Sequence, residues 1–188
     1  DGDVFCHRDY NGQELRLAAH FEDGPLMRAY QEDPHIDVHA YVKQLILDIA
    51  GLDYHRTQVK ITNFRRIYGG GAPATAGALN VSLEVAKELL RAHGQALPGL
   101  TALSKQIVYM AKSGEPIVTW GGREYYPEPP RHDKKYGRLM TYEYKLLNYL
   151  VQGSAADVTK EAILRYHRHP KKTGRFLVTV YDEINVSA

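Results

Sequence analysis

The sequence is poor in cysteine, and Cys6 is the only one among its 188 residues. One cysteine cannot form an internal disulfide, which excludes disulfide-stapled extracellular domains and favours a reducing compartment. No apolar run approaches the ~20 residues of a transmembrane helix, so we expect no membrane contact. The apolar share of 44% and the charged share of 24% exclude a collagen, a disordered tail and a coiled coil.

The net charge of +2 conceals two regions of opposite sign. Residues 1–55 carry 11 acidic and 4 basic side chains, whereas residues 56–175 carry 20 basic and 9 acidic ones. An acidic region beside a basic one is consistent with a metal site next to a groove for a polyanion, and a solvated charged surface is the alternative. The chain begins with Asp1 rather than Met and ends at Ala188 within a predicted strand, so we expect it to be part of a longer protein.

Local patterns predict a helix-rich α+β fold with few strands. One strand is predicted at 4–10, one hairpin at 117–126 and a second hairpin at 176–186. Helices are predicted at 13–20, 25–30, 38–49, 53–68, 83–92, 98–113 and 142–167. The predicted caps at the helix starts are Asp37, Asp53 and Ser82, and the predicted glycine stops are Gly51, Gly94 and Gly114. A polar, proline-rich loop is predicted at 127–135, and Gly153 is a predicted weak point of the last helix.

Two carboxylate positions point to a metal site. Asp9 follows a predicted strand and precedes a helix, and Asp182 and Glu183 form the tip of the last hairpin. Mg²⁺ takes one or two carboxylates and keeps its remaining positions for water and phosphate oxygens. Two such aspartates bridge a pair of ions ~3.5–4 Å apart in enzymes that transfer phosphoryl groups. Turn and cap roles explain each acid alone, and the metal hypothesis requires the first strand and the last hairpin to meet.

Four residues recur at intervals of four along one predicted helix: Arg56, Lys60, Phe64 and Tyr68. Each step of four advances about 400°, so successive members differ by only about 40° and lie along one slowly winding stripe. Two cations followed by two aromatic rings would form a phosphate clamp beside a stacking platform. The alternative is an amphipathic helix whose aromatic side chains face the core and whose basic ones face water.

Taken in order, these segments resemble the motifs of family A DNA polymerases, the bacterial repair-polymerase and phage replicase type. Residues 9–16, DYNGQELR, are similar to motif A, usually DYSxxELR. Residues 56–69, RTQVKITNFRRIYG, are similar to motif B, RxxxKxxxFxxxYG, and residues 181–183, YDE, to motif C, usually HDE. Residues 37–39, DVH, and 148–153, NYLVQG, resemble the DxH and NxxxQG segments of the family. The five ordered matches cover nearly the whole chain.

The resemblance implies a right-hand polymerase fold, with a palm of antiparallel strands and a helical fingers subdomain, lacking a thumb and an exonuclease. Residues 1–37 and 114–188 would form two parts of the palm, the second truncated, and residues 38–113 the fingers. The implied activity is template-directed DNA synthesis in replication or repair, by two-Mg²⁺ nucleotidyl transfer. The implied partners are primer–template DNA, deoxynucleoside triphosphates and a processivity or replisome partner, in the cytoplasm of a bacterial or phage-infected cell near the nucleoid.

The resemblance also implies residue roles. Asp9 and Asp182, with the carbonyl of Tyr10, would bind two Mg²⁺ ions, and Lys60 would act with them by neutralising the leaving pyrophosphate. The nucleotide would be bound by Gln13, Glu14, His39, Arg56, Lys60, Phe64 and Tyr68. The primer–template would be contacted by Arg16, Asn148, Gln152, Tyr181 and Glu183.

Some of these roles are more specific. Phe64 would pack on the sugar and limit the use of chain terminators, and Tyr68 would contact Glu14. Glu14 would occupy the space of a ribose 2′-hydroxyl and so select deoxynucleotides. The sequence departs from the family at Tyr181, where His is usual, and at Gln13, where an apolar residue is usual. We expect Gln13 to relax base selectivity.

Three other functions remain as alternatives. A single-subunit RNA polymerase shares the palm aspartates and the Lys/Tyr helix, but Glu14 and Phe64 argue against it. A non-catalytic, polymerase-like module that binds nucleic acid has no reason to retain both aspartates together with Arg56 and Lys60. A metal-dependent nuclease would degrade DNA where a polymerase extends a primer.

Overall fold

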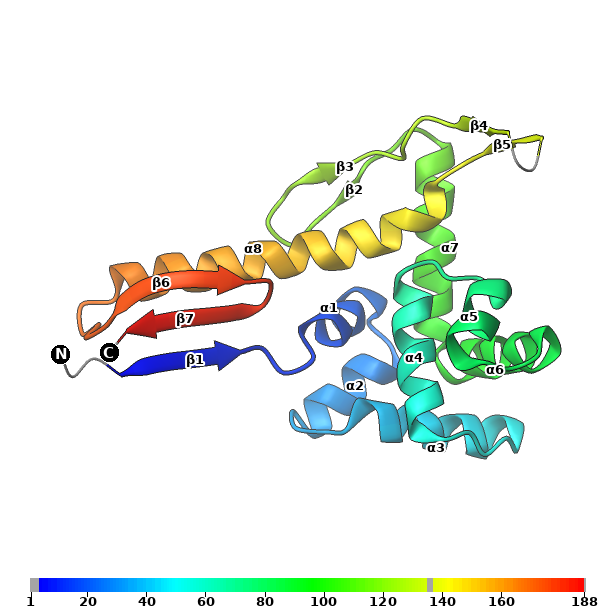
Figure 1. Ribbon diagram of the computed structural model, residues 1–188, viewed down its shortest axis with the longest axis horizontal. Coiled ribbons are helices and arrows are strands. Elements are labelled where there is room, and N and C mark those ends of the chain that lie inside the picture. Colours follow the sequence, from blue (N-terminus) through cyan, green and yellow to red (C-terminus); the bar gives the residue numbers. More distant parts are fainter. Residues whose placement is uncertain (1–3, 135–136, 188) are drawn as a thin grey trace.

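The computed structural model describes residues 4–134 and 137–187, which form α-helices and small antiparallel sheets (Figure 1). The α+β prediction is therefore confirmed. The main sheet has the strand order β1 (Phe5–Asp9), β7 (Glu183–Ser187) and β6 (Arg175–Val180). In its antiparallel register, Asp9 lies opposite Glu183. The first strand and the last hairpin therefore meet, as the metal hypothesis requires.

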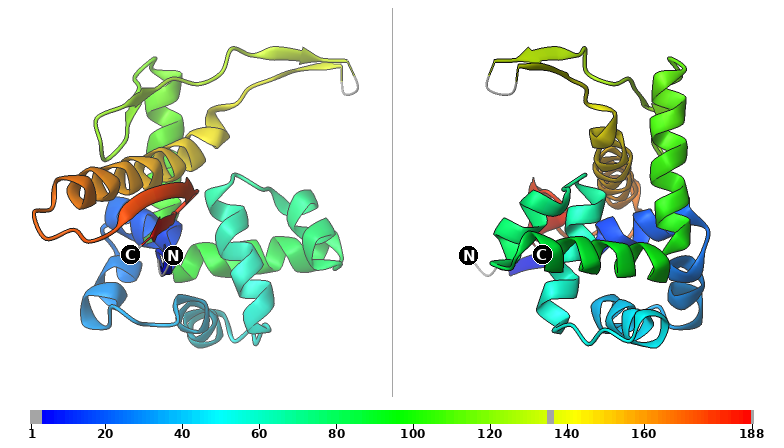
Figure 2. Two further views of the ribbon diagram at one scale, coloured as in Figure 1. Left: turned by 60° about the vertical axis from the view of Figure 1, so that its left-hand side comes forward. Right: turned by 90° about the vertical axis from the view of Figure 1, so that its right-hand side faces the viewer.

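Seven helices follow β1 in the described part of the chain before the next strand: α1 (Gln13–Glu22), α2 (Pro25–Glu32), α3 (Val38–Ala50), α4 (Arg56–Ile67), α5 (Ala72–Leu79), α6 (Leu83–Ala96) and α7 (Pro98–Lys112). Two short hairpins come next, β2 (Ile117–Val118) with β3 (Glu124–Tyr125), and β4 (Arg131–Asp133) with β5 (Arg138–Met140). A 3₁₀ turn, η1 (Glu143–Lys145), leads into the long helix α8 (Leu146–Arg168). Figures 1 and 2 show α8 running from the main sheet toward α7, with α3 to α6 grouped away from the sheet.

Several predicted helix ends are confirmed by their capping contacts. The Asp37 carboxylate accepts hydrogen bonds from two backbone N–H groups in the first turn of α3. Gly51 ends that helix with a φ of 67°, a left-handed conformation that favours glycine. The Ser82 hydroxyl accepts a hydrogen bond from the N–H of Val85 and so caps α6. These caps depend on residues close in sequence, which is why local patterns predicted them.

Other predicted boundaries were wrong. Asp53 does not cap α4, because its carboxylate pairs with Lys43 at 2.8 Å. The cap is His55, which forms a reciprocal capping box with Gln58. Gly94 does not end α6, which continues to Ala96. The loop predicted at 127–135 contains strand β4, and its last residue, at position 135, lies outside the described residues.

The core joins the helices that carry the candidate site. Large apolar side chains with no exposed surface come from α2, α3, α4, α6 and α8, and fully buried alanines come from α1 and α6; the large ones are Leu26, Val42, Ile46, Val59, Ile67, Leu89, Leu146 and Val151. Helix α8 continues through Gly153, and the weakness predicted at this position stays a prediction. A Cβ at this position would lie 2.7 Å from Thr119 Cγ2 and 3.0 Å from Tyr125 Cε2, so the missing side chain lets the β2–β3 hairpin pack on the helix. Within the described residues, no helix combines the length and apolarity needed to cross a membrane.

Candidate functional site

The predicted carboxylates and the predicted cations line one cavity of about 560 Å³, which we call the first cavity. Asp9, at the end of β1, and Asp182, in the turn between β6 and β7, lie on the sheet side. Arg56 and Lys60 line it from α4. The first cavity is also lined by predicted site residues from the β1–α1 loop, α1, α3 and α4: Tyr10, Gln13, Glu14, Arg16, His39 and Phe64. The sheet register thus brings both aspartates to the cavity that Arg56 and Lys60, in the first turns of α4, also line.

A second cavity of about 580 Å³ adjoins the first. It is lined by three of the residues predicted to contact primer–template, namely Asn148, Gln152 and Tyr181. Gln13, Glu14 and Asp182 line both cavities. The Oδ1 atom of Asn148 is buried and has no hydrogen-bond partner within the described residues, and buried acceptors of this kind usually have one. Asn148 thus lines the second cavity, and its buried amide oxygen is unpaired within the described residues.

The stripe predicted on α4 exists, although its aromatic members differ in exposure. The Phe64 and Tyr68 rings stack with centroids 6.3 Å apart and an interplanar angle of 20°. The His39 ring approaches Phe64 at 5.9 Å. Phe64 is half-buried against the core, but Tyr68 keeps 42% of its surface exposed. The alternative with both aromatic side chains in the core is therefore wrong for Tyr68.

Glu14 connects α1 to both α4 and α8. The Tyr68 hydroxyl donates a hydrogen bond to Glu14 Oε1 at 2.8 Å, which confirms the predicted contact. The Gln152 amide donates to the same carboxylate oxygen and, at 3.2 Å, to the Tyr68 hydroxyl. Burial, followed by the hydrogen bond to Glu14, raises the pKa of Tyr68 to about 12. The phenol is therefore protonated at neutral pH and acts as a donor that fixes the carboxylate between the two cavities.

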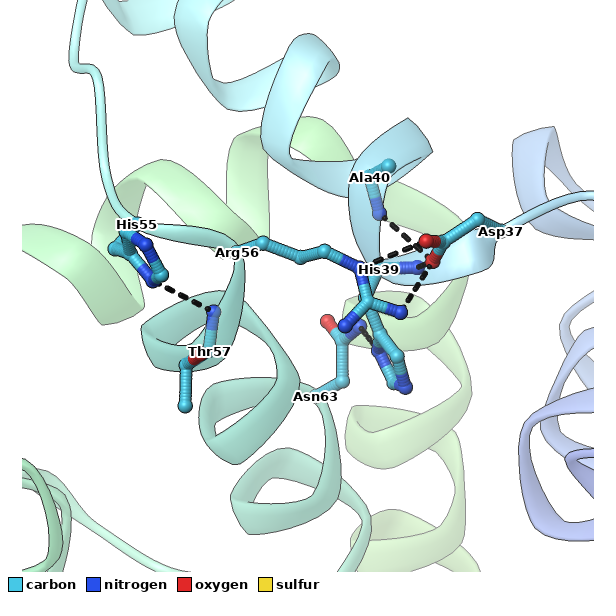
Figure 3. Close-up of polar contacts among 7 residues, drawn as sticks. All are labelled: Asp37, His39, Ala40, His55, Arg56, Thr57 and Asn63. Atoms are coloured by element: carbon cyan, nitrogen blue, oxygen red, sulfur yellow. Dashed lines mark hydrogen bonds and ion pairs between the residues drawn. The ribbon is translucent and has the colours of Figure 1, made fainter.

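Arg56 is held by a carboxylate at the edge of the first cavity (Figure 3). Its Nε lies 2.7 Å from Asp37 Oδ2 and its Nη2 lies 2.9 Å from Asp37 Oδ1, a two-point contact. The hydrogen bond to Arg56 lowers the pKa of the Asp37 carboxyl, so that group stays ionised. Because the guanidinium fork fits carboxylate and phosphate equally well, Asp37 occupies donors that a phosphate group would use.

His39 contacts a residue that the motif analysis missed. Its Nδ1 lies 2.9 Å from Nδ2 of Asn63 (Figure 3). Burial, followed by the charge of Arg56, lowers the pKa of His39, so the ring is neutral at neutral pH. Asn63 stands four residues from both Val59 and Ile67, on the buried side of α4. A polar residue at that spacing was the sequence signal that could have identified it.

Two predicted site residues are engaged with the protein itself. Arg16 donates to the carbonyl of Asn11 at 2.8 Å and to that of Pro34 at 2.5 Å, and its guanidinium stacks over Tyr30. Gln13 is only 6% exposed, and its amide donates to the backbone and to a threonine hydroxyl of α8, both at 3.3 Å. Their roles toward DNA and nucleotide stay predictions.

The two neighbours of Asp182 differ in orientation. The Glu183 carboxylate pairs with His7 at 3.1 Å and accepts a hydrogen bond from Asn185 at 2.7 Å. Tyr181 is 92% exposed and has a φ of 55°. An aromatic residue rarely adopts this left-handed conformation, and such strain is concentrated at functional sites. The turn therefore presents Tyr181 to solvent, while Glu183 lies against the sheet.

Asp9 and Asp182 fit a magnesium ion by the chemistry of their donors. No group of three or more His, Cys, Asp or Glu side chains in the described residues forms a ready-made metal site. Mg²⁺ does not need one, because one or two carboxylates suffice when water and phosphate oxygens complete the octahedron. A backbone carbonyl such as that of Tyr10, which also lines the first cavity, is a further oxygen ligand of the right kind.

Comparison with known proteins gives one consistent result. The family model described as DNA polymerase family A matches residues 1–188. The chain is 34% identical over 187 residues to the DNA polymerase of Mycobacterium phage L5, covering 99% of this chain and 28% of that protein. It is 30% identical over 187 residues to DNA polymerase I of Bacillus caldotenax, covering 96% of this chain and 21% of that protein.

A solved structure agrees with these sequence matches. The POL domain of Pol1 from M. smegmatis, in complex with DNA primer-template and dNTP, is similar with a TM-score of 0.83 and 25% identity. The match covers 100% of this chain and 34% of that one. The chain thus spans between 21% and 34% of the length of these three relatives.

Proposed function

Because the chain belongs to DNA polymerase family A, we propose that it carries the nucleotidyl-transfer site of a template-directed DNA polymerase acting in replication or repair. Residues 1–37 and 114–188 would form the palm and residues 38–113 the fingers. One observation carries the proposal: Asp9 and Asp182 line the same cavity as Arg56 and Lys60. Two carboxylates facing two cations is the arrangement that the metals and phosphates of a nucleotide complex require.

Divalent metal ions are general to this family, and in our proposal Asp9, Asp182 and the Tyr10 carbonyl hold two Mg²⁺ ions. When bound, such ions lower the pKa of an attacking hydroxyl and neutralise phosphate charge. The carboxylates come from the end of one strand and the adjoining turn of a hairpin paired with it. The backbone hydrogen bonds of the sheet therefore fix their spacing before any ligand binds, which reduces the cost of ordering the site.

The first turns of α4, which carry Arg56 and Lys60, would bind the triphosphate. Arg56 would exchange its two-point contact with Asp37 for one with phosphate oxygens. Lys60, which is exposed at the first cavity, would neutralise the leaving pyrophosphate and donate a proton to it. Phe64 would pack on the sugar, with His39 beside it. The residues of this chain thus act mainly by positioning and by opposing charge, which is what phosphoryl transfer demands.

Glu14 would select the sugar. Its carboxylate is fixed by Tyr68 and Gln152, so it cannot easily move aside for a ribose 2′-hydroxyl. We therefore propose deoxynucleoside triphosphates as the substrates. Efficient use of ribonucleotides would favour the RNA polymerase alternative.

The second cavity would bind primer–template beside the nucleotide, through Asn148, Gln152 and Tyr181. Because Asp182 and Glu14 line both cavities, the primer end and the incoming nucleotide would meet at these residues. Such binding should weaken with salt and depend little on DNA sequence. A processivity partner and association with the nucleoid stay predictions.

The deciding experiment is Mg²⁺-dependent primer extension by the full-length protein and its Asp182→Asn variant. Asparagine keeps the size of the side chain and removes its charge, so we expect extension to fall by roughly 10²-fold or more. Asp53→Asn is the matched control, since Asp53 is exposed and outside both cavities. Equal extension by wild type and Asp182→Asn would remove the motif C assignment. Loss of DNA without extension would indicate a nuclease.

A further inference from the structure

Three polar side chains from three helices form a hydrogen-bonded series that leads inward from the first cavity. His39 of α3 contacts Asn63 of α4, and Asn63 contacts His93 of α6. The distances are 2.9 Å from Asn63 Nδ2 to His39 Nδ1 and 2.7 Å from Asn63 Oδ1 to His93 Nε2. Asn63 is 1% exposed and His93 is fully buried. Buried polar groups cost stability unless their bonds are well matched, so the direction of each hydrogen bond can be worked out.

His93, the innermost of the three side chains, fixes the direction of both hydrogen bonds. Nδ1 of His93 is buried and has no hydrogen-bond partner within the described residues. A buried N–H without an acceptor is rarer in proteins than a buried acceptor without a donor, so Nδ1 carries the lone pair. Full burial and the charge of Arg66 keep this ring neutral by lowering its pKa to about 3. The single ring proton of His93 therefore resides on Nε2 and is donated to Asn63 Oδ1.

The position of the proton on His39 then follows from the geometry of the Asn63 amide. With its oxygen facing His93, Asn63 presents its NH₂ group to Nδ1 of His39, which must accept and so carries no proton. The proton of the neutral His39 ring then resides on Nε2. No protein partner of this atom is found among the described residues. The His39 ring lines the first cavity together with Arg56 and Lys60.

We propose that Asn63 and His93 are positioning residues that hold His39 as its Nε2-protonated tautomer, so that a neutral imidazole presents an N–H donor to the triphosphate of the incoming nucleotide. The nucleotide part of this inference rests on the proposed function, whereas the tautomer does not. The opposite tautomer would direct a lone pair at the phosphate oxygens, which is repulsive. Loss of one hydrogen bond to a charged group corresponds to a rise of roughly tenfold or more in the KM for nucleotide.

The tautomer is tested directly by ¹⁵N NMR of histidine side chains in the full-length protein, with His39 assigned by a His39→Gln variant. We expect a protonated Nε2 and an unprotonated Nδ1. Asn63→Asp is the informative variant, because a carboxylate can only accept and would draw a proton onto His39 Nδ1. An unprotonated Nδ1 in both wild type and Asn63→Asp, or a protonated Nδ1 in wild type, overturns the inference.

Single-nucleotide incorporation tests the consequence. His93→Phe keeps a flat ring but removes the donor, so the Asn63 amide loses its fixed orientation, and we expect KM to rise with little change in kcat. His93→Gln places an amide N–H near the position of Nε2 and should restore KM. A structural role alone predicts that KM rises further when His93→Phe is added to His39→Gln, whereas our inference predicts no further rise.

The two proposals fail in distinguishable ways. Normal primer extension with the His39 proton on Nδ1 overturns the positioning inference and leaves the proposed function intact. The expected tautomer without any primer extension overturns the proposed function, and with it the nucleotide part of the inference. Circular dichroism melts of each variant identify any change in KM that arises from unfolding.

Discussion

His93 should make the stability of this protein sensitive to acid. The ring is fully buried, and its pKa is lowered to about 3 from the ordinary value of 6.5. In the unfolded chain the imidazole takes up a proton below about pH 6.5, but in the folded chain it does not. The unfolded state thus binds more protons, so the free energy of unfolding falls as the pH falls. The loss begins near the unfolded pKa and ends only near the folded one.

The magnitude follows from one proton per molecule. Below the unfolded pKa, the free energy of unfolding falls by at most ~1.4 kcal/mol per pH unit. Between about pH 6.5 and about pH 5, His93 should therefore cost ~2 kcal/mol, a large part of the 5–15 kcal/mol typical of folded proteins. His39 changes stability in the same direction, because its pKa is also lowered. The contribution of His93 must therefore be measured as a difference between variants.

The assay is urea denaturation of the full-length protein, His93→Phe and His93→Gln at several pH values between about 7 and about 5. Neither replacement titrates in this range, so both variants should lose less stability on acidification than wild type does. Their absolute stabilities at pH 7 need not agree, since only His93→Gln retains a donor for Asn63. Parallel pH dependence of all three proteins would refute the reasoning, because His93 would then have the same pKa in both states.

Three further predictions concern Asp37, Gly153 and Gln13. Asp37→Asn retains the oxygen that caps α3 but loses the charge that holds Arg56, so the KM for nucleotide should fall a few-fold in steady-state kinetics; a rise would mean that the ion pair positions Arg56 for phosphate. Gly153→Ala should lower the unfolding free energy by ~1–3 kcal/mol in thermal denaturation, since its Cβ would meet a hairpin carbon at 2.7 Å. Gly77→Ala, with no atom within 4 Å of the new Cβ, is the control and should be neutral or stabilising. Gln13→Ile should reduce misinsertion, and an unchanged misinsertion rate would contradict the role assigned to Gln13.

The individual residues of the candidate site were predictable because their signals are local, whereas the meeting of Asp9 with Asp182 depends on strands far apart in sequence. Asp9 ends a strand and Asp182 lies in a hairpin tip, and short strands with charged ends are visible in a single sequence. The stripe on α4 follows from the helical period alone, since a spacing of four keeps residues on one face. The Asp37 and Ser82 caps likewise involve partners two or three residues away.

The features that the sequence did not reveal depend on partners distant in sequence or on weak local patterns. Helix α5 is rich in small residues and has no apolar period, so no helix was predicted there. Asp53 has the residue type and position of a helix cap, but its carboxylate forms an ion pair with Lys43 of the preceding helix. The packing reason for a glycine at position 153 was also hidden from local patterns, because its neighbours lie about 30 residues earlier, in the β2–β3 hairpin. The role we assign to Asn63 required knowing that His93 stands behind it.

Two carboxylates hold the ends of α4, and this arrangement bears on how an anionic substrate would enter. Asp37 holds Arg56 at the first turn, and Glu14 holds Tyr68 just beyond the last. A phosphate that displaces Asp37 replaces one anion by another, so Arg56 remains neutralised throughout and the net cost is less than that of desolvating a free guanidinium. The bond to Tyr68 involves a neutral phenol and does not compete with phosphate. Exchange of anions should therefore occur at the first turn of α4, while the last turn stays fixed on Glu14.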